Sequence, residues 1–313
     1  MKILICPLNW GLGHATRCVP LIRQLITDGH EPVLVSDGYP LEFLRQEFPY
    51  LRTIEYPSYS IHYATGKSQV SAMLFNLPNI IRGILNEHDW LKNILKTEHF
   101  DQVISDNRFG MWNKGVHSIY ITHQLMIKMP AGLRFLEPVV HLIHKGFINR
   151  YNECWIPDTL ENGGLSGDLS HQYPLPKNAH FIGALSRFKG IDTNRINTDY
   201  KVVAVVSGIE PQRTMFEKQL TERFRNVAYK TLLIAGQPQA QKRENHIGNI
   251  TIVSHLPDAE LAAVLLGAAR IISRSGYSTI MDLDALGCLE KAELIATPGQ
   301  TEQEYLKIIH NDS

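Results

Sequence analysis

A histidine lies in a glycine-rich segment near the start of the chain. The segment Gly11-Leu12-Gly13-His14 follows a short apolar run, Lys2–Cys6, and opens a stretch with helical spacing. Glycine lets the backbone approach a ligand closely, and the free amides at a helix start favour an anion. The positive end of the helix dipole favours a neutral imidazole, which can accept a proton. We interpret His14 as a candidate general base, with helix capping as the alternative.

Two further segments of small and hydroxyl-bearing residues begin helical patterns in the second half of the chain. One follows the apolar run Val202–Val206, and the other follows Arg270–Ser273. Amides and hydroxyls in such positions suit a diphosphate, and an acid one helical turn further suits ribose hydroxyls. An ordinary strand–helix turn is the alternative for the first segment. Together with Gly11 and Gly13, the predicted nucleotide-binding residues are Ser207, Gly208, Arg274, Ser275, Gly276, Ser278, Thr279 and Asp282.

A polar segment follows the last predicted strand, Glu293–Ala296. It carries Gln303 and Glu304, whose amide and carboxylate groups are common partners of sugar hydroxyls. The alternative is a capping segment, in which Thr301 caps the next helix and Glu304 completes the box.

Other polar residues follow two predicted strands of the first half, Gln102–Ser105 and Ile119–Thr122. Ligands of parallel α/β sheets bind outside the carboxyl ends of the strands, so these residues are expected to face the same cleft. Asp106 is a second candidate base. Loop hydrogen bonding is the alternative for the residues expected on the acceptor side, which are Asn107, Arg108, His123 and Gln124.

The elements that must position these residues alternate along the whole chain. Short apolar runs alternate with helical patterns, as is typical of parallel α/β sheets, and this alternation restarts after the polar stretch Ser186–Asp199. We therefore predict two open parallel-sheet, Rossmann-like domains that face each other across a cleft. Residues 1–185 form the acceptor-side domain and residues 186–313 the donor-binding domain. Three helices are predicted in the first half, at Ala15–Asp28, at Val70–Leu95 with a kink or break at Pro78, and at Leu133–Asn149.

The bulk properties restrict the setting of the protein. The 313 residues suit two domains, and 31 basic residues balance 31 acidic ones, which gives no indication of a nucleic-acid partner. The four scattered cysteines indicate reduced thiols in the cytoplasm. No apolar run approaches the ~20 residues of a membrane span, so any membrane contact is expected to be peripheral. Ile127–Arg150 combines apolar and basic residues and is the candidate for such contact, with packing on the sheet as the favoured alternative.

With these motifs in this order, the chain resembles the GT-B glycosyltransferases. It is most similar to the branch of the bacterial N-acetylglucosaminyltransferase that acts on undecaprenyl-diphospho-muramoylpentapeptide. The shared elements are the Gly-rich loop ending in His14, the Ser207-Gly208 loop, the Arg274–Asp282 element and the Gln303 loop. The resemblance implies transfer from a UDP-sugar, with N-acetylglucosamine as one expected sugar, to a hydroxyl acceptor for which a lipid-linked molecule is one option. It also implies that no metal and no further cofactor is used.

Two features depart from that family. Asp282 stands where the family has a glutamate, and the chain ends at Ser313, just after the helix predicted from Glu302 begins, so we expect a short C-terminal domain. A second resemblance concerns the run Gly11-Leu12-Gly13-His14-Ala15-Thr16-Arg17-Cys18. It is similar to UDP-sugar hydrolases of nonulosonic acid synthesis, which share the fold and pass the glycosyl group to water. A hydrolase or epimerase, and a non-catalytic nucleotide-sugar-binding protein, are therefore the alternative functions.

Overall fold

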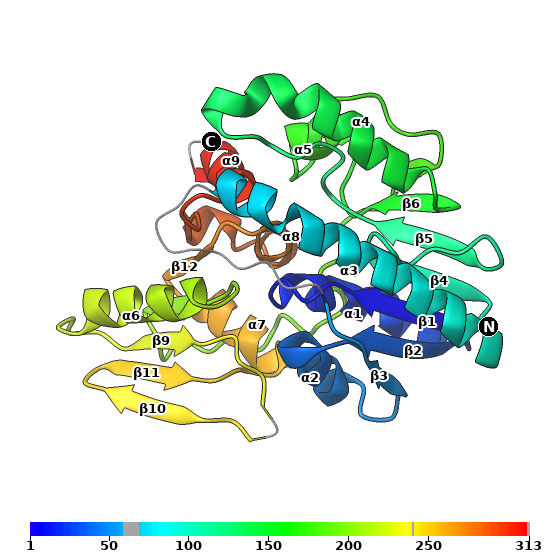
Figure 1. Cartoon of the computed structure of the whole chain (residues 1–313). Coiled ribbons are helices and arrows are strands. Elements are labelled where there is room, and N and C mark those ends of the chain that lie inside the picture. The colour runs from blue at the N-terminus through cyan, green and yellow to red at the C-terminus, as the bar shows by residue number, and fades with distance from the viewer. Residues whose placement is uncertain (59–68, 240, 312–313) are drawn as a thin grey trace.

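Two parallel sheets organise the protein, and this confirms the predicted fold class. The structure is a computed structural model that describes residues 1–58, 69–239 and 241–311 (Figure 1). Within these residues the first sheet has seven strands in the order β3-β2-β1-β4-β5-β6-β7, all paired in parallel. The strands are β1 (Lys2–Pro7), β2 (Glu31–Ser36), β3 (Thr53–Glu55), β4 (Gln102–Asp106), β5 (His117–Ile121), β6 (Glu153–Ile156) and β7 (Ala179–Phe181).

The second sheet has six strands in the described part of the chain, in the order β10-β11-β9-β8-β12-β13. Its pairs are parallel except for β10 with β11, which form an antiparallel hairpin at one edge. The strands are β8 (Val202–Val205), β9 (Thr231–Ile234), β10 (Glu244–Ile247), β11 (Ile250–Val253), β12 (Arg270–Arg274) and β13 (Ala292–Ile295).

Helices cover both faces of each sheet. The α-helices are α1 (Gly13–Thr27), α2 (Gly38–Glu47), α3 (Gln69–Thr97), α4 (Glu137–Ile148), α5 (Asp168–His171), α6 (Gln212–Phe224), α7 (Asp258–Gly267), α8 (Tyr277–Ala285) and α9 (Thr301–Asn311). Short 3-10 helices are η1 (Ala131–Leu136), η2 (Glu161–Gly163) and η3 (Leu289–Lys291).

The apolar pattern of β1 explains this layering. Ile3 and Ile5 belong to a core that includes residues of α1 and α2, whereas Leu4 and Cys6 belong to a core with Leu91 of α3. Successive side chains of a strand point to opposite faces, so a continuous apolar run produces a strand that is buried on both sides. In the second sheet the same alternation separates the core under α7 and α8 from the core under α6.

Several details differ from the predictions made from the sequence. Helix α2 and strands β3 and β10 were not predicted, since each is short and only weakly patterned. Helix α3 runs through Pro78 as one helix, so of the predicted kink or break the break is wrong, and the kink stays a prediction. The segment predicted as one helix at Leu133–Asn149 is divided between η1 and α4.

The two sheets are joined by the segment between Phe181 and Val202, which contains the predicted domain boundary at residues 185 and 186. Helices α1 and α8 contact each other across the interface between the sheets. Leu169, from α5, packs into the core of the second sheet beside Leu306 of α9. None of the described helices has the length and apolar character needed to cross a bilayer.

Candidate active site

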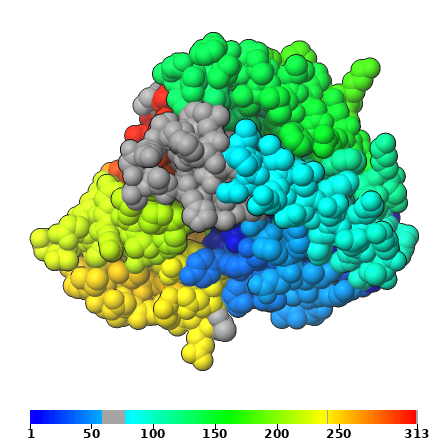
Figure 2. Space-filling view, in the orientation of Figure 1, coloured from blue at the N-terminus to red at the C-terminus, as the bar shows by residue number. Residues whose placement is uncertain are grey.

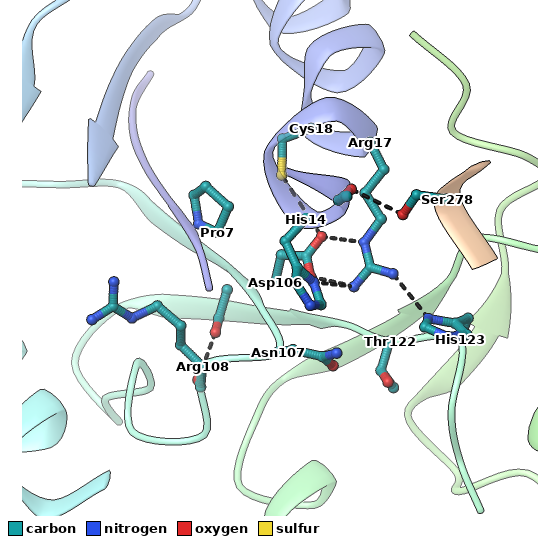
Figure 3. Close-up of polar contacts among 12 residues, drawn as sticks. Pro7, His14, Arg17, Cys18, Asp106, Asn107, Arg108, Thr122, His123 and Ser278 are labelled. Atoms are coloured by element: carbon teal, nitrogen blue, oxygen red, sulfur yellow. Dashed lines mark hydrogen bonds and ion pairs between the residues drawn. The ribbon is translucent and has the colours of Figure 1, made fainter. Parts of the chain in front are cut away.

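A histidine and an aspartate form a hydrogen-bonded pair at the carboxyl end of the first sheet. Strands β1 and β4 are neighbours, and Pro7 at the end of β1 lies opposite Asp106 at the end of β4. Helix α1 begins at Gly13, just beyond β1, and this brings His14 Nδ1 within 2.7 Å of Asp106 Oδ1 (Figure 3). Because an ionised carboxylate only accepts hydrogen bonds, Nδ1 carries the proton and Nε2 is the nitrogen that can accept one.

Arg17 holds the aspartate of this His14–Asp106 dyad. It lies one turn along α1 from His14, on the same helix face, and its guanidinium bonds both oxygens of Asp106. Arg17 and Asp106 are both buried. Burial alone would raise the pKa of the Asp106 carboxyl, but Arg17 and His14 outweigh it and lower the pKa to about 2. Asp106 is therefore a permanently ionised partner of His14, and this argues against its predicted role as a second base.

A second histidine extends the network to the other domain. Arg17 Nη1 donates to His123 Nδ1 at 2.9 Å, and His123 Nε2 lies 2.7 Å from Glu302 Oε1 on α9. The His123 ring also stacks on Tyr277 of α8, with ring centroids 4.2 Å apart. The dyad thus lies where both domains meet.

Two pockets open beside the dyad at the carboxyl ends of the strands. The first, which we call the dyad pocket, has a volume of about 250 Å³, and His14, Asn107, His123, Gln124 and Gln303 are among the residues that line it. The second, which we call the α8 pocket, has a volume of about 190 Å³ and lies between α1, α2 and the strand ends of the second sheet. Both pockets are lined by Gly13, Ser207, Ser278 and Thr279.

The two glycine-rich loops approach each other across the cleft. Gly11 has φ +93° and Gly208 has φ +112°, backbone conformations that favour glycine. A Cβ on Gly11 would lie 3.8 Å from Gly208 Cα, so the loops are close to van der Waals contact. Ser278 Oγ at the start of α8 donates to the Gly13 carbonyl at 2.9 Å. The amide-bearing starts of α1 and α8 therefore converge at this part of the cleft.

The side chains of three residues predicted to bind the donor have partners within the protein. Arg274 is buried over the Phe216 ring, with its guanidinium carbon 3.8 Å from the ring centroid, and donates to the Ala296 carbonyl. Burial lowers its pKa to about 10. Ser275 Oγ donates to the Gln303 carbonyl at 2.7 Å. Glu304 accepts from the Gly299 amide, so its carboxylate holds a loop.

Arg108 is a further correction. Its side chain is buried and points away from the dyad (Figure 3), because the left-handed conformation of Asn107, at φ +57°, turns the chain at this point. Arg108 Nε bonds Glu87 Oε1 of α3 at 2.8 Å, and the guanidinium lies over the Tyr56 ring. The predicted acceptor-side residue is thus a buried ion-pair partner within the first domain.

Asp282 lines the α8 pocket, but its carboxylate already has protein partners. Ser186 Oγ and the Arg187 amide donate to Oδ1 at 2.7 and 3.2 Å, and Arg187 Nε lies 3.2 Å from Oδ2. Burial dominates here and raises the pKa of Asp282 to about 6, although Arg187 acts to lower it.

Acidic residues do not converge on a cation site among the residues that the structure describes. Asp282 and Asp284 are two residues apart on α8, where side chains at this spacing do not face each other. Asp282 is buried and Asp284 is exposed.

Three residues of the site were not singled out from the sequence, namely Arg17, Arg187 and Glu302. Arg17 stands at i+3 from His14 within the matched run, and this spacing could have placed it beside the dyad. Arg187 and Glu302 carry no comparable signal, because their partners lie far away in the sequence. Arg187 meets Asp282, which is 95 residues away, and Glu302 meets His123, which is 179 residues away.

No protein-family model matches the chain. Over 97% of its length it is 22% identical to an uncharacterized glycosyltransferase of Methanosarcina acetivorans, of which it covers 82%. The structure is similar to spinosyn rhamnosyltransferase in complex with thymidine diphosphate, with a TM-score of 0.57 and 12% identity, over 98% of this chain and 84% of that one.

A protein of Listeria monocytogenes assigned as a UDP-N-acetylglucosamine 2-epimerase is also similar. Its TM-score is 0.55 at 12% identity, over the whole of this chain and 88% of that one. The two parallel sheets, the cleft between them and these neighbours together show that the chain has the GT-B fold.

Proposed function

We propose that the chain is a glycosyltransferase that moves a sugar from a nucleoside diphosphate-sugar to a hydroxyl acceptor without a metal. The observation that carries the proposal is the His14–Asp106 dyad, which faces a pocket also lined by the Ser207-Gly208 loop and the start of α8. The sequence relative in Methanosarcina acetivorans, a glycosyltransferase by name, supports this class of activity.

The dyad would supply the base. Nε2 of His14 takes the proton of the acceptor hydroxyl while the acceptor oxygen forms a bond to the anomeric carbon of the sugar. The bond from that carbon to the diphosphate breaks, and its electron pair leaves with the diphosphate. Asp106 holds the imidazole in the required tautomer and stabilises the imidazolium that forms.

The donor would lie mostly on the second domain. Ser207 and the start of α8 line both pockets and Gly208 lines the dyad pocket, and backbone amides in such positions stabilise a departing diphosphate. The nucleoside then occupies the α8 pocket, with Asp282 at its ribose, and the sugar extends into the dyad pocket toward Gln303. We propose UDP as the nucleotide and N-acetylglucosamine as the sugar. The thymidine diphosphate in the spinosyn enzyme makes TDP the first competitor to test.

Hydrolysis of the donor is the second candidate function, and one observation favours it. Three residues of the run shared with the UDP-sugar hydrolases meet at one carboxylate: His14 and Arg17 bond Asp106, and Cys18 Sγ approaches its Oδ2 at 3.8 Å. In that function His14 would take the proton from water instead of from an acceptor hydroxyl.

Incubation of the protein with UDP-, TDP- and GDP-sugars separates these functions. Nucleoside diphosphate released only when a hydroxyl acceptor is added indicates transfer, and release in its absence indicates hydrolysis. Binding in calorimetry without release supports a nucleotide-sugar-binding protein. If no nucleoside diphosphate binds or is released, the proposed function is wrong.

We propose a lipid-linked molecule as the acceptor to test, and the exposed side chains of η1 and α4 support this option. Phe135, Val139, Leu142 and Ile143 are all more than half exposed, although Ile148 at the end of α4 packs on the sheet in a core with Tyr120 and Cys154, as the favoured alternative expected. Arg134 and Arg150, in and just after the same segment, are also exposed. Helix α4, in green, forms part of the face seen in Figure 2. An apolar surface with a basic rim suits an anionic membrane.

Co-sedimentation with anionic vesicles tests this part of the proposal. We expect Leu142→Glu to reduce binding and Leu160→Glu, at a similarly exposed leucine outside α4, to leave it unchanged. Failure of the unmodified protein to bind would remove the membrane option and leave the transferase proposal in place.

A further inference from the structure

A cluster of five charged residues lies at one side of the α8 pocket, which Glu47, Arg187 and Asp282 of the cluster line. Arg187 Nη1 lies 3.3 Å from Asp258 Oδ1 at the start of α7, and Arg23 Nη2 lies 3.3 Å from the other Asp258 oxygen. Arg23 also pairs with Glu47 of α2 at 3.1 Å. With Asp282, the cluster joins both domains and the segment between the two sheets.

Arg187 is fixed in this cluster by its backbone as well as by its side chain. Its amide donates to Asp282, its carbonyl accepts a bond from Arg23 at 3.0 Å, and its guanidinium lies over the Phe188 ring. The Nε contact with Asp282 Oδ2 is an ion pair that lacks hydrogen-bond geometry. Oδ2 therefore keeps lone pairs for a donor in the pocket, which Asp282 and Arg187 both line.

The charge balance around Asp282 makes this position of Arg187 important. Asp258 and Glu47 are acids in the same cluster, and burial disfavours an ionised Asp282. Ser186 donates a hydrogen bond to Asp282, and Arg187 places a positive charge beside it. Both residues belong to the segment between the sheets. Without Arg187, little positive charge would offset the repulsion between the carboxylates of Asp282 and Asp258.

We propose that Arg187 is a positioning residue that keeps Asp282 ionised and turned toward the α8 pocket, so that Asp282 accepts hydrogen bonds from the ribose hydroxyls of the donor. This rests on the proposed function, because it presumes that a nucleoside diphosphate binds there. It means that the segment between the two domains, and not the second domain alone, completes the nucleoside site.

The affinity for UDP as a function of pH tests the proposal by calorimetry. The pKa of Asp282 is about 6, so UDP should bind the unmodified protein about tenfold more tightly at pH 7.5 than at pH 5. In Arg187→Met the pKa rises further, so affinity at pH 7.5 should fall about tenfold while affinity at pH 5 stays close to that of the unmodified protein. A loss of UDP affinity at pH 7.5 without a loss at pH 5 indicates a positioning role, whereas general damage to the fold would lower the affinity at both pH values.

Three further variants complete the test. Arg195→Met removes an exposed arginine eight residues further along the same segment and should leave both affinities unchanged. His255 also lines the α8 pocket and titrates at acid pH, so His255→Gln should keep the pH dependence. Ser186→Ala should shift affinity in the same direction as Arg187→Met by a smaller factor, and it carries the test if that variant does not fold.

Unchanged or tighter UDP binding by Arg187→Met at pH 7.5 would overturn the proposal, as would an equal loss at both pH values. Absence of binding of UDP, TDP and GDP to the unmodified protein is a different result, because it contradicts the proposed function itself.

Discussion

Asp106 and Asp282 are both buried carboxylates beside an arginine, yet their pKa values move in opposite directions, to about 2 and to about 6. Asp106 has both oxygens bonded by the Arg17 guanidinium and a further bond with His14. Asp282 shares its arginine with Asp258, at distances of 3.2 and 3.3 Å. Burial disfavours both anions, so the number of positive partners per carboxylate decides the outcome.

The difference separates two tasks in one cleft. A carboxylate that must orient a base through many reaction cycles has to remain charged, and the contacts of Arg17 secure this. A carboxylate that binds ribose hydroxyls needs free lone pairs, so fewer of them can accept bonds from protein donors. Its ionised form is therefore less stabilised, and its pKa is higher.

The largest effect is expected from removal of the candidate base. His14→Ala should lower turnover by about 10²–10⁴-fold, since it removes the imidazole whose Nε2 would take the acceptor proton. Because the nucleotide would lie mainly on the second domain, the Kd for UDP should change little. Steady-state kinetics and calorimetry measure the two quantities. Turnover within about threefold of the unmodified protein would remove His14 from the mechanism.

Loss of the charge on Asp106 should be the next largest effect. Asp106→Asn leaves the buried Arg17 without a counter-ion, which typically reduces the free energy of unfolding by about 3 kcal/mol. A lowered carboxyl pKa contributes stability above the unfolded-state value of ~4 and loses it as the pH falls toward the folded value. Urea unfolding should therefore show a constant deficit for the variant from pH 8 to about pH 4.5. A deficit that vanishes already at pH 6 would contradict the interpretation of Asp106.

The smallest effect is expected at Asp282, with the opposite sign. A carboxyl whose pKa is raised in the folded state gives up stability as the pH increases from ~4 to the folded value of about 6. Asp282→Asn should therefore raise the midpoint of thermal unfolding by a few degrees at pH 7.5 and leave it nearly unchanged at pH 4. A lower midpoint at pH 7.5 would show that the ion pair with Arg187 outweighs burial.

The order of strands and helices could be predicted from the sequence because it depends on local periodicity. The apolar runs of β1, β4 and β12 are continuous, and their ends mark the loops that surround the cleft. Edge elements such as β10 escaped prediction, since the residues Glu244–Ile247 are mostly exposed and carry little apolar pattern.

The direction of individual side chains in the candidate site was harder to predict from the sequence. Arg274 belongs to a recognisable element, but it is the last residue of β12 and packs over Phe216 of α6, so its guanidinium does not line either pocket. Arg108 was misplaced because the chain turns in a left-handed conformation at Asn107, which asparagine tolerates but which its residue type alone does not fix. Contacts between segments far apart in the chain decide both cases.

The meeting of the α1 and α8 starts, joined by the bond from Ser278 to Gly13, also has a consequence for how quickly an anion arrives. The chain has no net charge, so a distant diphosphate experiences little overall attraction. The partial charges of helix ends act only within a few ångströms, which is less than the ~8 Å screening length of physiological salt. Association of a nucleotide should then depend weakly on ionic strength, and the contacts at these helix ends should be felt mainly in how long the complex persists.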